Sequence, residues 1–183
     1  MTRIIGGRAG GRRLRTPSGE ATRPTSDRVR EALFSSIESW AGTLQGLRFL
    51  DLYAGSGAVG LEAWSRGAAA VTLVESDRRT AALVRSNAHD LGADVQVVSG
   101  SVAAFLRREP GEPFDVVFSD PPYPLADDAV AADLAALVPW LGGGALVVVE
   151  RSARSPEPGW PDGLVHDRTK RYGETVLCYG HAP

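Results

Sequence analysis

Short apolar runs alternate with longer stretches of helical spacing along most of the chain. Runs of four to six apolar residues are typical of buried strands, and apolar positions three and four apart are typical of helices. The pattern predicts strands at 47–50, 70–75, 95–98, 114–118 and 145–150, and helices at 61–66, 78–91, 103–108 and 127–137. Such alternation predicts an open, mostly parallel α/β sheet with helices on both faces.

Each end of the chain adds a different pattern. Residues 164–169 and 175–179 predict two final strands around Arg171-Tyr172-Gly173, an antiparallel hairpin that completes a seven-stranded sheet. At the N-terminus, residues 2–5 and 12–15 flank a glycine-rich turn and predict a second β-hairpin. Ser26 or Asp27 then caps a helix through residue 37. We therefore expect an N-terminal extension over 1–46 and a main domain over 47–183.

The stretch Asp51-Leu-Tyr-Ala-Gly-Ser-Gly-Ala-Val-Gly60 lies between a predicted strand and a predicted helix. Gly55 and Gly57 lack a Cβ and let the backbone approach a ligand. The following helix N-terminus offers unpaired N–H groups to polar or anionic parts of it. The spacing Gly55-x-Gly57-x-x-Gly60 also fits the dinucleotide fingerprint, so this stretch allows either a nicotinamide cofactor or S-adenosylmethionine (SAM).

Two acidic residues narrow the choice of ligand. Glu75 ends the second predicted strand, twenty positions after Gly55, where an acid can accept hydrogen bonds from both ribose hydroxyls of a nucleoside. Asp51 ends the first strand and either caps the turn or holds a ligand ammonium group. SAM carries such an ammonium and a nicotinamide cofactor does not.

The segment Asp120-Pro121-Pro122-Tyr123 follows the fourth predicted strand. Because two prolines stiffen the turn, the Asp120 carboxylate and the Pro121 carbonyl are held as fixed acceptors. An exocyclic nucleobase amine offers two donors to such a pair, and Tyr123 offers a face for the base to stack on. A paired base does not reach this position, so the target base must be unstacked. Alone, the segment also fits an ordinary structural turn.

Charge is spread unevenly along the 183 residues, whose formal net charge is only −2. Residues 1–30 hold eight arginines and two acids, a net charge of +6, which is typical of an arm that meets nucleic acid. A solvated, partly disordered tail is the alternative. The single cysteine, Cys178, excludes an internal disulfide and a cysteine-rich zinc site. No signal peptide or membrane span is predicted, so we expect a cytoplasmic protein. We also expect a monomer without a metal.

Several motifs together resemble one methyltransferase family. The glycine turn with Asp-Pro-Pro-Tyr downstream is similar to SAM-dependent enzymes that methylate amines. Five further motifs resemble the RsmD family, and the resemblance covers nearly the whole chain: Arg3-Ile-Ile-Gly-Gly7, Gly11-Arg-Arg-Leu14, Arg23-Pro-Thr25, Asp27-Arg-Val-Arg-Glu-Ala-Leu-Phe34 and Arg171-Tyr-Gly173. The resemblance implies a Rossmann-like class I methyltransferase fold and methyl transfer from SAM to the N2 amine of one guanine, guanine 966, in bacterial 16S ribosomal RNA (rRNA) during small-subunit maturation.

The resemblance also implies roles for particular residues. The implied cofactor contacts are Asp51, Tyr53, Gly55, Gly57, Glu75, Ser76, Ser101 and Val102. The implied catalytic residues are Asp120, Pro121 and Tyr123, and the implied RNA contacts are Arg8, Arg12, Arg13, Arg15, Arg23, Thr25 and Pro122. Many relatives carry an acid where Ser101 stands, so the adenine contact is expected to differ here.

Other functions remain open on the residues alone. An NAD-dependent oxidoreductase would share the glycine turn and Glu75 but would have no use for the Asp120–Tyr123 segment. A non-catalytic RNA-binding assembly factor would keep the arginines but does not need Asp120. Methylation of adenine N6 or cytosine N4, in DNA or RNA, needs the same acceptors as methylation of guanine N2.

Overall fold

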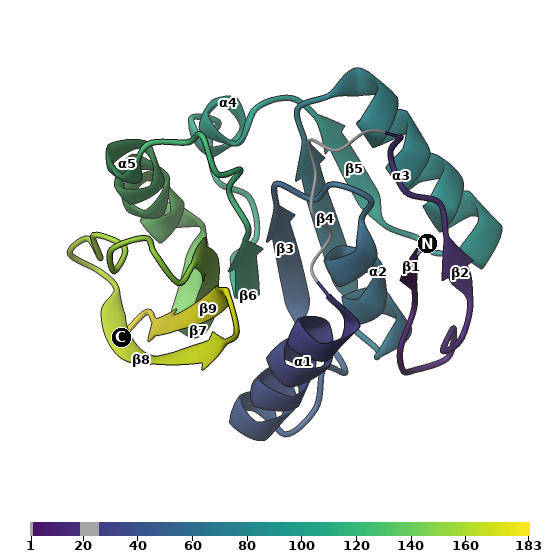
Figure 1. Ribbon diagram of the computed structural model, residues 1–183, viewed down its shortest axis with the longest axis horizontal. Coiled ribbons are helices and arrows are strands. Elements are labelled where there is room, and N and C mark those ends of the chain that lie inside the picture. Colours follow the sequence, from purple (N-terminus) through teal and green to yellow (C-terminus); the bar gives the residue numbers. More distant parts are fainter. Residues whose placement is uncertain (1, 19–25) are drawn as a thin grey trace.

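A computed structural model describes residues 2–18 and 26–183. A twisted sheet of seven strands crosses the molecule, and the N-terminal hairpin lies beside α2 (Ala58–Ser65) and α3 (Arg78–Leu91) (Figure 1). The strand order is β5-β4-β3-β6-β7-β9-β8, with β3 at the centre between β4 and β6. The pairs among β3 to β7 are parallel, and the C-terminal strands pair antiparallel. The predicted α/β class and C-terminal hairpin are confirmed.

The predicted elements are all present, with small shifts at their ends. The strands are β1 Thr2–Arg3, β2 Arg13–Leu14, β3 Arg48–Leu52, β4 Ala70–Glu75, β5 Gln96–Ser99, β6 Phe114–Ser119, β7 Leu141–Ser152, β8 Val165–Tyr172 and β9 Thr175–His181. The helices are α1 Asp27–Ala41, α2 Ala58–Ser65, α3 Arg78–Leu91, α4 Val102–Leu106, α5 Asp127–Leu137 and the 3-10 turn Val138–Trp140. The largest difference is β7, which extends through the glycines before it.

Local chemistry fixes the helix ends that position the site. The Ser26 hydroxyl accepts a hydrogen bond from Val29 N and begins α1, as predicted. The Asp77 carboxylate accepts from Thr80 N at 2.8 Å, which begins α3 and lowers the pKa of Asp77. Helix α3 ends at Gly92, in the left-handed conformation that glycine favours.

Alternating strand residues divide the core into two layers. One layer packs the sheet against α1, α2, α3 and the N-terminal hairpin, and it includes Leu33, Phe49 and Leu73. The other packs the sheet against α4 and α5, and it includes Leu50 and Val74. Because the helices cover both faces, the carboxyl ends of the parallel strands are left to form a site. Within the described residues, no helix has the length and apolar character needed to cross a bilayer.

The N-terminal hairpin is packed against the main domain. Ile4 and Leu14 are buried in the same core layer as Leu73. The Glu62 carboxylate of α2 accepts hydrogen bonds from Ile5 N and Gly6 N, each at 2.8 Å. These contacts contradict the alternative of a solvated tail for residues 2–15. The division at residue 46 stays a prediction.

Candidate functional site

The carboxyl ends of three adjacent strands bring the predicted site residues to one edge of the sheet. Asp51 lies next to the last residue of β3, Glu75 ends β4, and Asp120 directly follows β6. Since β3 pairs with both β4 and β6, the glycine turn after β3 lies between the other two strand ends. The sequence predicted this arrangement because parallel strands all end at the same edge.

The two glycines of the turn have different roles. Gly55 has φ +57°, and no atom outside its immediate neighbours lies within 4 Å of where its Cβ would be. That open side leaves room for a ligand. A Cβ on Gly57, whose φ is +84°, would lie 2.9 Å from the Val84 side chain. Gly57 therefore lets α2 begin close against α3, a packing role in addition to the ligand approach expected from the sequence.

Glu75 links the glycine turn to the start of α3. Its Oε2 accepts from Gly55 N at 2.8 Å, and its Oε1 accepts from Asp77 N at 3.1 Å. Each carboxylate oxygen retains a further lone pair after these bonds, so the group can still accept ligand hydroxyls. The half-buried carboxylate is thus held in a fixed orientation beside the open side of Gly55.

Asp51 is buried, with 1% of its surface exposed. Its Oδ2 accepts from Gly60 N at 2.9 Å, which ties the strand end to the first turn of α2. Burial raises the pKa of Asp51 to about 8, the Gly60 hydrogen bond opposes that rise, and the charge of Glu75 adds to it. The capping role is present, and a cation at this position would favour the ionised carboxylate.

Tyr53, which directly follows β3, links the start of the glycine turn to α5. It is a non-glycine residue with φ +60°, an uncommon conformation for a side chain of its size. Its hydroxyl donates to the Asp133 carboxylate on α5. Burial, followed by this bond, raises the pKa of Tyr53, and burial also raises the pKa of Asp133. The bond therefore ties the chain after β3 to the helix that follows the Asp120–Tyr123 segment.

The remaining predicted cofactor residues lie along the same edge. Ser76 is exposed directly after β4. The Ser101 hydroxyl accepts from Ala104 N at 3.1 Å and caps α4. Val102 is buried in the layer beneath α4 and α5, so its side chain serves packing.

The predicted catalytic segment leaves the sheet beside the glycine turn. Asp120 is half-buried and Pro121 is buried, whereas Pro122 and Tyr123 are exposed. Leu125 N donates to the Pro122 carbonyl at 2.9 Å, which closes a turn within the segment. The Tyr123 side chain is 64% exposed, a large aromatic face open to a stacking partner.

The N-terminal arginines are exposed but anchored. Arg8 donates to Trp64 O at 3.0 Å and lies 4.2 Å from the Trp64 ring centroid. Arg12 donates to Asp90 O at 2.8 Å, and Arg15 lies 3.4 Å from the Asp90 carboxylate. Arg13 is exposed at the end of the hairpin. The predicted contacts Arg23 and Thr25 fall outside the described residues.

Asn87 connects the hairpin to the glycine turn, and it was not among the predicted site residues. This side chain on α3 is 2% exposed. Its amide oxygen accepts from Arg15 N at 2.9 Å, and its amide nitrogen donates to Arg15 O at 2.9 Å and Ser56 O at 3.1 Å. Nothing in the local pattern indicates the partner, because Arg15 lies far away in the sequence.

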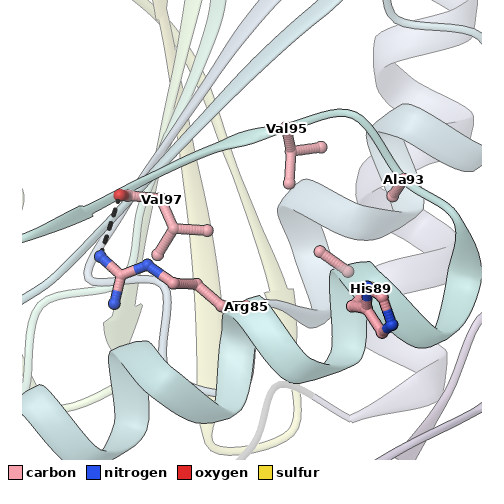
Figure 2. A pocket seen from close by; sticks show the side chains of 6 residues that line it. Arg85, His89, Ala93, Val95 and Val97 are labelled. Carbon is pink, nitrogen blue, oxygen red and sulfur yellow. Dashed lines mark hydrogen bonds between the residues drawn. The ribbon is translucent and has the colours of Figure 1, made fainter.

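A shallow hollow of about 300 Å³ lies outside this site, between α3 and β5 (Figure 2). Arg85 and His89 of α3 line it with Val95 and Val97, and Arg85 Nη2 donates to Val97 O at 3.3 Å. Its lining comes from the second half of α3 and from the chain that enters β5. The hollow therefore lies away from the carboxyl ends of the strands.

Comparison with known proteins agrees with this geometry. The profile of the family described as "Conserved hypothetical protein 95" matches residues 2–181. Ribosomal RNA small subunit methyltransferase D of Escherichia coli K12 is 38% identical over 175 residues, which are 95% of this chain and 86% of that protein. The protein of the same name from Haemophilus influenzae is 38% identical over 160 residues, which are 84% of this chain and 80% of that protein.

A solved structure gives the same result for the fold. An Escherichia coli protein described as a methyltransferase superposes with a TM-score of 0.86 at 34% identity, covering 98% of this chain and 97% of that one. Since the profile and the relatives both span nearly the whole sequence, this chain belongs to the RsmD family of SAM-dependent methyltransferases.

Proposed function

We propose that this chain transfers the methyl group of SAM to the N2 amine of one guanine in 16S rRNA, guanine 966, during small-subunit maturation. The observation that carries the proposal is the adjacency of β3 and β6, which brings the glycine turn beside Asp120 and Pro121. The names of the curated relatives support ribosomal RNA as the substrate. The acceptor pair supports an exocyclic amine as the methylated group.

The residues around the glycine turn fit SAM. The fixed Glu75 carboxylate would accept the ribose hydroxyls, and the open side of Gly55 leaves space next to it. Asp51 would face the ammonium of the methionine part. When bound, SAM supplies an electrophilic methyl group on a positively charged sulfur.

Asp120 and the Pro121 carbonyl would then accept hydrogen bonds from the target amine and aim its nitrogen at that methyl group. Held by Glu75 and Asp51, SAM would supply its methyl group to that nitrogen, and the electron pair of the broken carbon–sulfur bond would stay on sulfur. The amine proton leaves to Asp120 or to water. Guanine N2 is a weak nucleophile, so positioning and stabilisation of the developing positive charge carry the catalysis.

Substitution of Asp120 tests this mechanism. Asp120→Ala is expected to keep SAM affinity and most RNA affinity and to lose about a hundredfold in methyl transfer, because the acceptor is strongest in the transition state. Asp120→Asn keeps one acceptor oxygen and should be intermediate. Asp128→Ala removes an exposed acid of α5 and is the matched control. Single-turnover methylation by the folded variants measures the loss, and near-normal turnover of Asp120→Ala would exclude this role.

Nucleoside analysis tests the target. After reaction of the purified protein with 16S rRNA and with partly assembled small subunits, digestion and mass spectrometry should yield N2-methylguanosine. Detection of methylated adenosine or cytidine instead would show that the substrate base is adenine or cytosine rather than guanine. Binding of NAD instead of SAM would reject the methyltransferase assignment.

A further inference from the structure

The edge strand β8 carries basic side chains that the methyl-transfer site does not use. Arg168, Lys170 and Arg171 are exposed along this strand, although the chain as a whole has a net charge of −2. The acid between them and the strand start, Asp167, lies 2.8 Å from His181 Nδ1. Within residues 2–18 and 26–183, no acidic side chain forms an ion pair with any of the three basic groups.

Strand register places these side chains level with the proposed catalytic residue. Backbone pairing carries the position of Ser119 on β6 across β7 and β9 to Thr169 on β8. Since β8 runs in the same direction as β6, Lys170 is level with Asp120 and Arg171 lies one residue beyond. Three strand spacings of about 4.8 Å separate β6 from β8, a distance of about 14 Å.

The basic side chains flank both faces of the edge strand. Lys170 pairs with Leu177, whose side chain belongs to the core layer beneath α1. Arg171 pairs with Val176, which packs on the layer beneath α5. The Arg171 Nε–H also donates to Gly173 O at 2.9 Å, which holds the hairpin turn in place. Positive charge therefore lies at the end of the hairpin nearest the candidate site, and Arg171 is held there by its bond to Gly173.

We propose that β8, from Arg168 to Arg171, binds backbone phosphates of the RNA nucleotides next to the target base. This inference rests on the proposed function. A base held at Asp120 must leave its stack, so the phosphates beside it continue across the protein surface. Nucleotides of a stacked strand advance about 3.4 Å each, so about 14 Å corresponds to about four nucleotides or to fewer extended ones. The β8 surface and the N-terminal hairpin would then bind different stretches of one RNA.

Charge reversal at Lys170 tests this surface. Lys170→Glu is expected to weaken binding of 16S rRNA about tenfold at low salt and to reduce the slope of log affinity against log salt by about 0.7 per lost phosphate contact. Lys170→Arg should restore both values, and SAM affinity should stay unchanged in each variant. Arg107→Glu is the matched control, because Arg107 is exposed after α4 and lies outside the proposed surface.

The controls separate the possible failures. Equal RNA affinity of Lys170→Glu and Arg107→Glu would overturn the inference. Charges on an edge strand also prevent unwanted strand pairing. A neutral Lys170→Gln variant that self-associates in gel filtration while its monomer keeps full RNA affinity would favour that explanation and overturn ours. A wild-type protein that binds 16S rRNA through Lys170 but transfers no methyl group would overturn the proposed function alone.

Discussion

At the scale of single residues, burial makes Asp51 a group that titrates near neutral pH. Its pKa is raised to about 8, so the carboxyl is mostly protonated at pH 7 in the free protein. If the ionised form binds the ammonium of SAM, binding must release a proton. SAM affinity should therefore rise about tenfold per pH unit from pH 6 and level off near pH 8, where a free α-amino group also begins to lose its proton, at about 7.7–8.0.

Calorimetry in buffers of different ionisation enthalpy measures the released proton. At pH 7 we expect about one proton per SAM bound to the wild-type protein and almost none for Asp51→Asn. This variant keeps an oxygen that can accept from Gly60 N. A wild-type affinity that does not change between pH 6 and 8 would move the ammonium contact away from Asp51.

The raised pKa of Asp51 has the opposite effect on the stability of the free protein, which should fall as the pH rises. The folded-state pKa of Asp51 lies above its ordinary value of 3.8, so the folded protein binds this proton more tightly than the unfolded chain. The stabilising contribution is complete below about pH 4 and is lost as the pH rises through about 8. Asp51→Asn should thus raise the melting temperature more at pH 9 than at pH 5.

At the scale of secondary-structure elements, Glu62 joins α1, α2 and the N-terminal hairpin. Its buried carboxylate accepts two hairpin N–H groups and lies 3.5 Å from the Nε of Arg30, which is also fully buried. Arg66 Nε donates to it as well, at 2.8 Å. Burial lowers the pKa of Arg30, and the charges of Glu62 and Asp27 oppose that effect. Glu62 is therefore the buried counter-charge of Arg30, and Asp27 is an exposed one at 3.2 Å.

Neutralising Glu62 should destabilise the fold more than its size suggests. Glu62→Gln leaves the buried Arg30 charge with only the exposed Asp27 carboxylate, 3.2 Å from its Nη2, so we expect a loss of about 3–5 kcal/mol in the free energy of unfolding. Glu38→Gln is the matched control, because Glu38 pairs with Arg66 at 3.2 Å and is partly exposed, where about 0–1 kcal/mol is expected. Urea unfolding measures the free energy lost in each variant, and equal losses would show that the buried pair stabilises the fold no more than the exposed pair does.

These elements also mark what the sequence could predict. Residue spacing and capping residues predict α1, α3 and α5, and the parallel topology predicts that Glu75 lies beside Gly55, as the structure has them. The sequence pattern does not predict side-chain contacts between segments that are far apart along the chain. Glu62 stands in an apolar helix whose pattern gives no hint of partners near residues 5 and 30, and Asp133 is one acid in an alanine-rich helix. Local pattern determines elements, whereas such pairings depend on how the elements pack.

At the scale of the whole molecule, one side chain contacts both the N-terminal hairpin and the glycine turn. Asn87 bonds the backbone of Arg15 on one side and the Ser56 carbonyl on the other. Arg15 is a predicted RNA contact, and Ser56 lies between the two glycines of the turn. If the hairpin moved on binding RNA, the Asn87 hydrogen bond that holds the glycine turn at Ser56 would therefore change. We expect RNA and SAM to affect each other's affinity by the same factor, since coupling between two sites is reciprocal.

Asn87→Ala should break this connection. Three partly buried backbone groups lose their partner, so we expect a loss of about 1–3 kcal/mol in unfolding free energy, together with weaker SAM binding and a reduced effect of RNA on it. Ser86→Ala is the matched control. It removes only an exposed hydroxyl that accepts from Arg15 Nη1 at 3.1 Å, and it should change stability by less than about 0.5 kcal/mol. SAM titrations with and without 16S rRNA measure the coupling. If Asn87→Ala is less stable but keeps the wild-type coupling factor, the hairpin and the glycine turn bind their ligands independently.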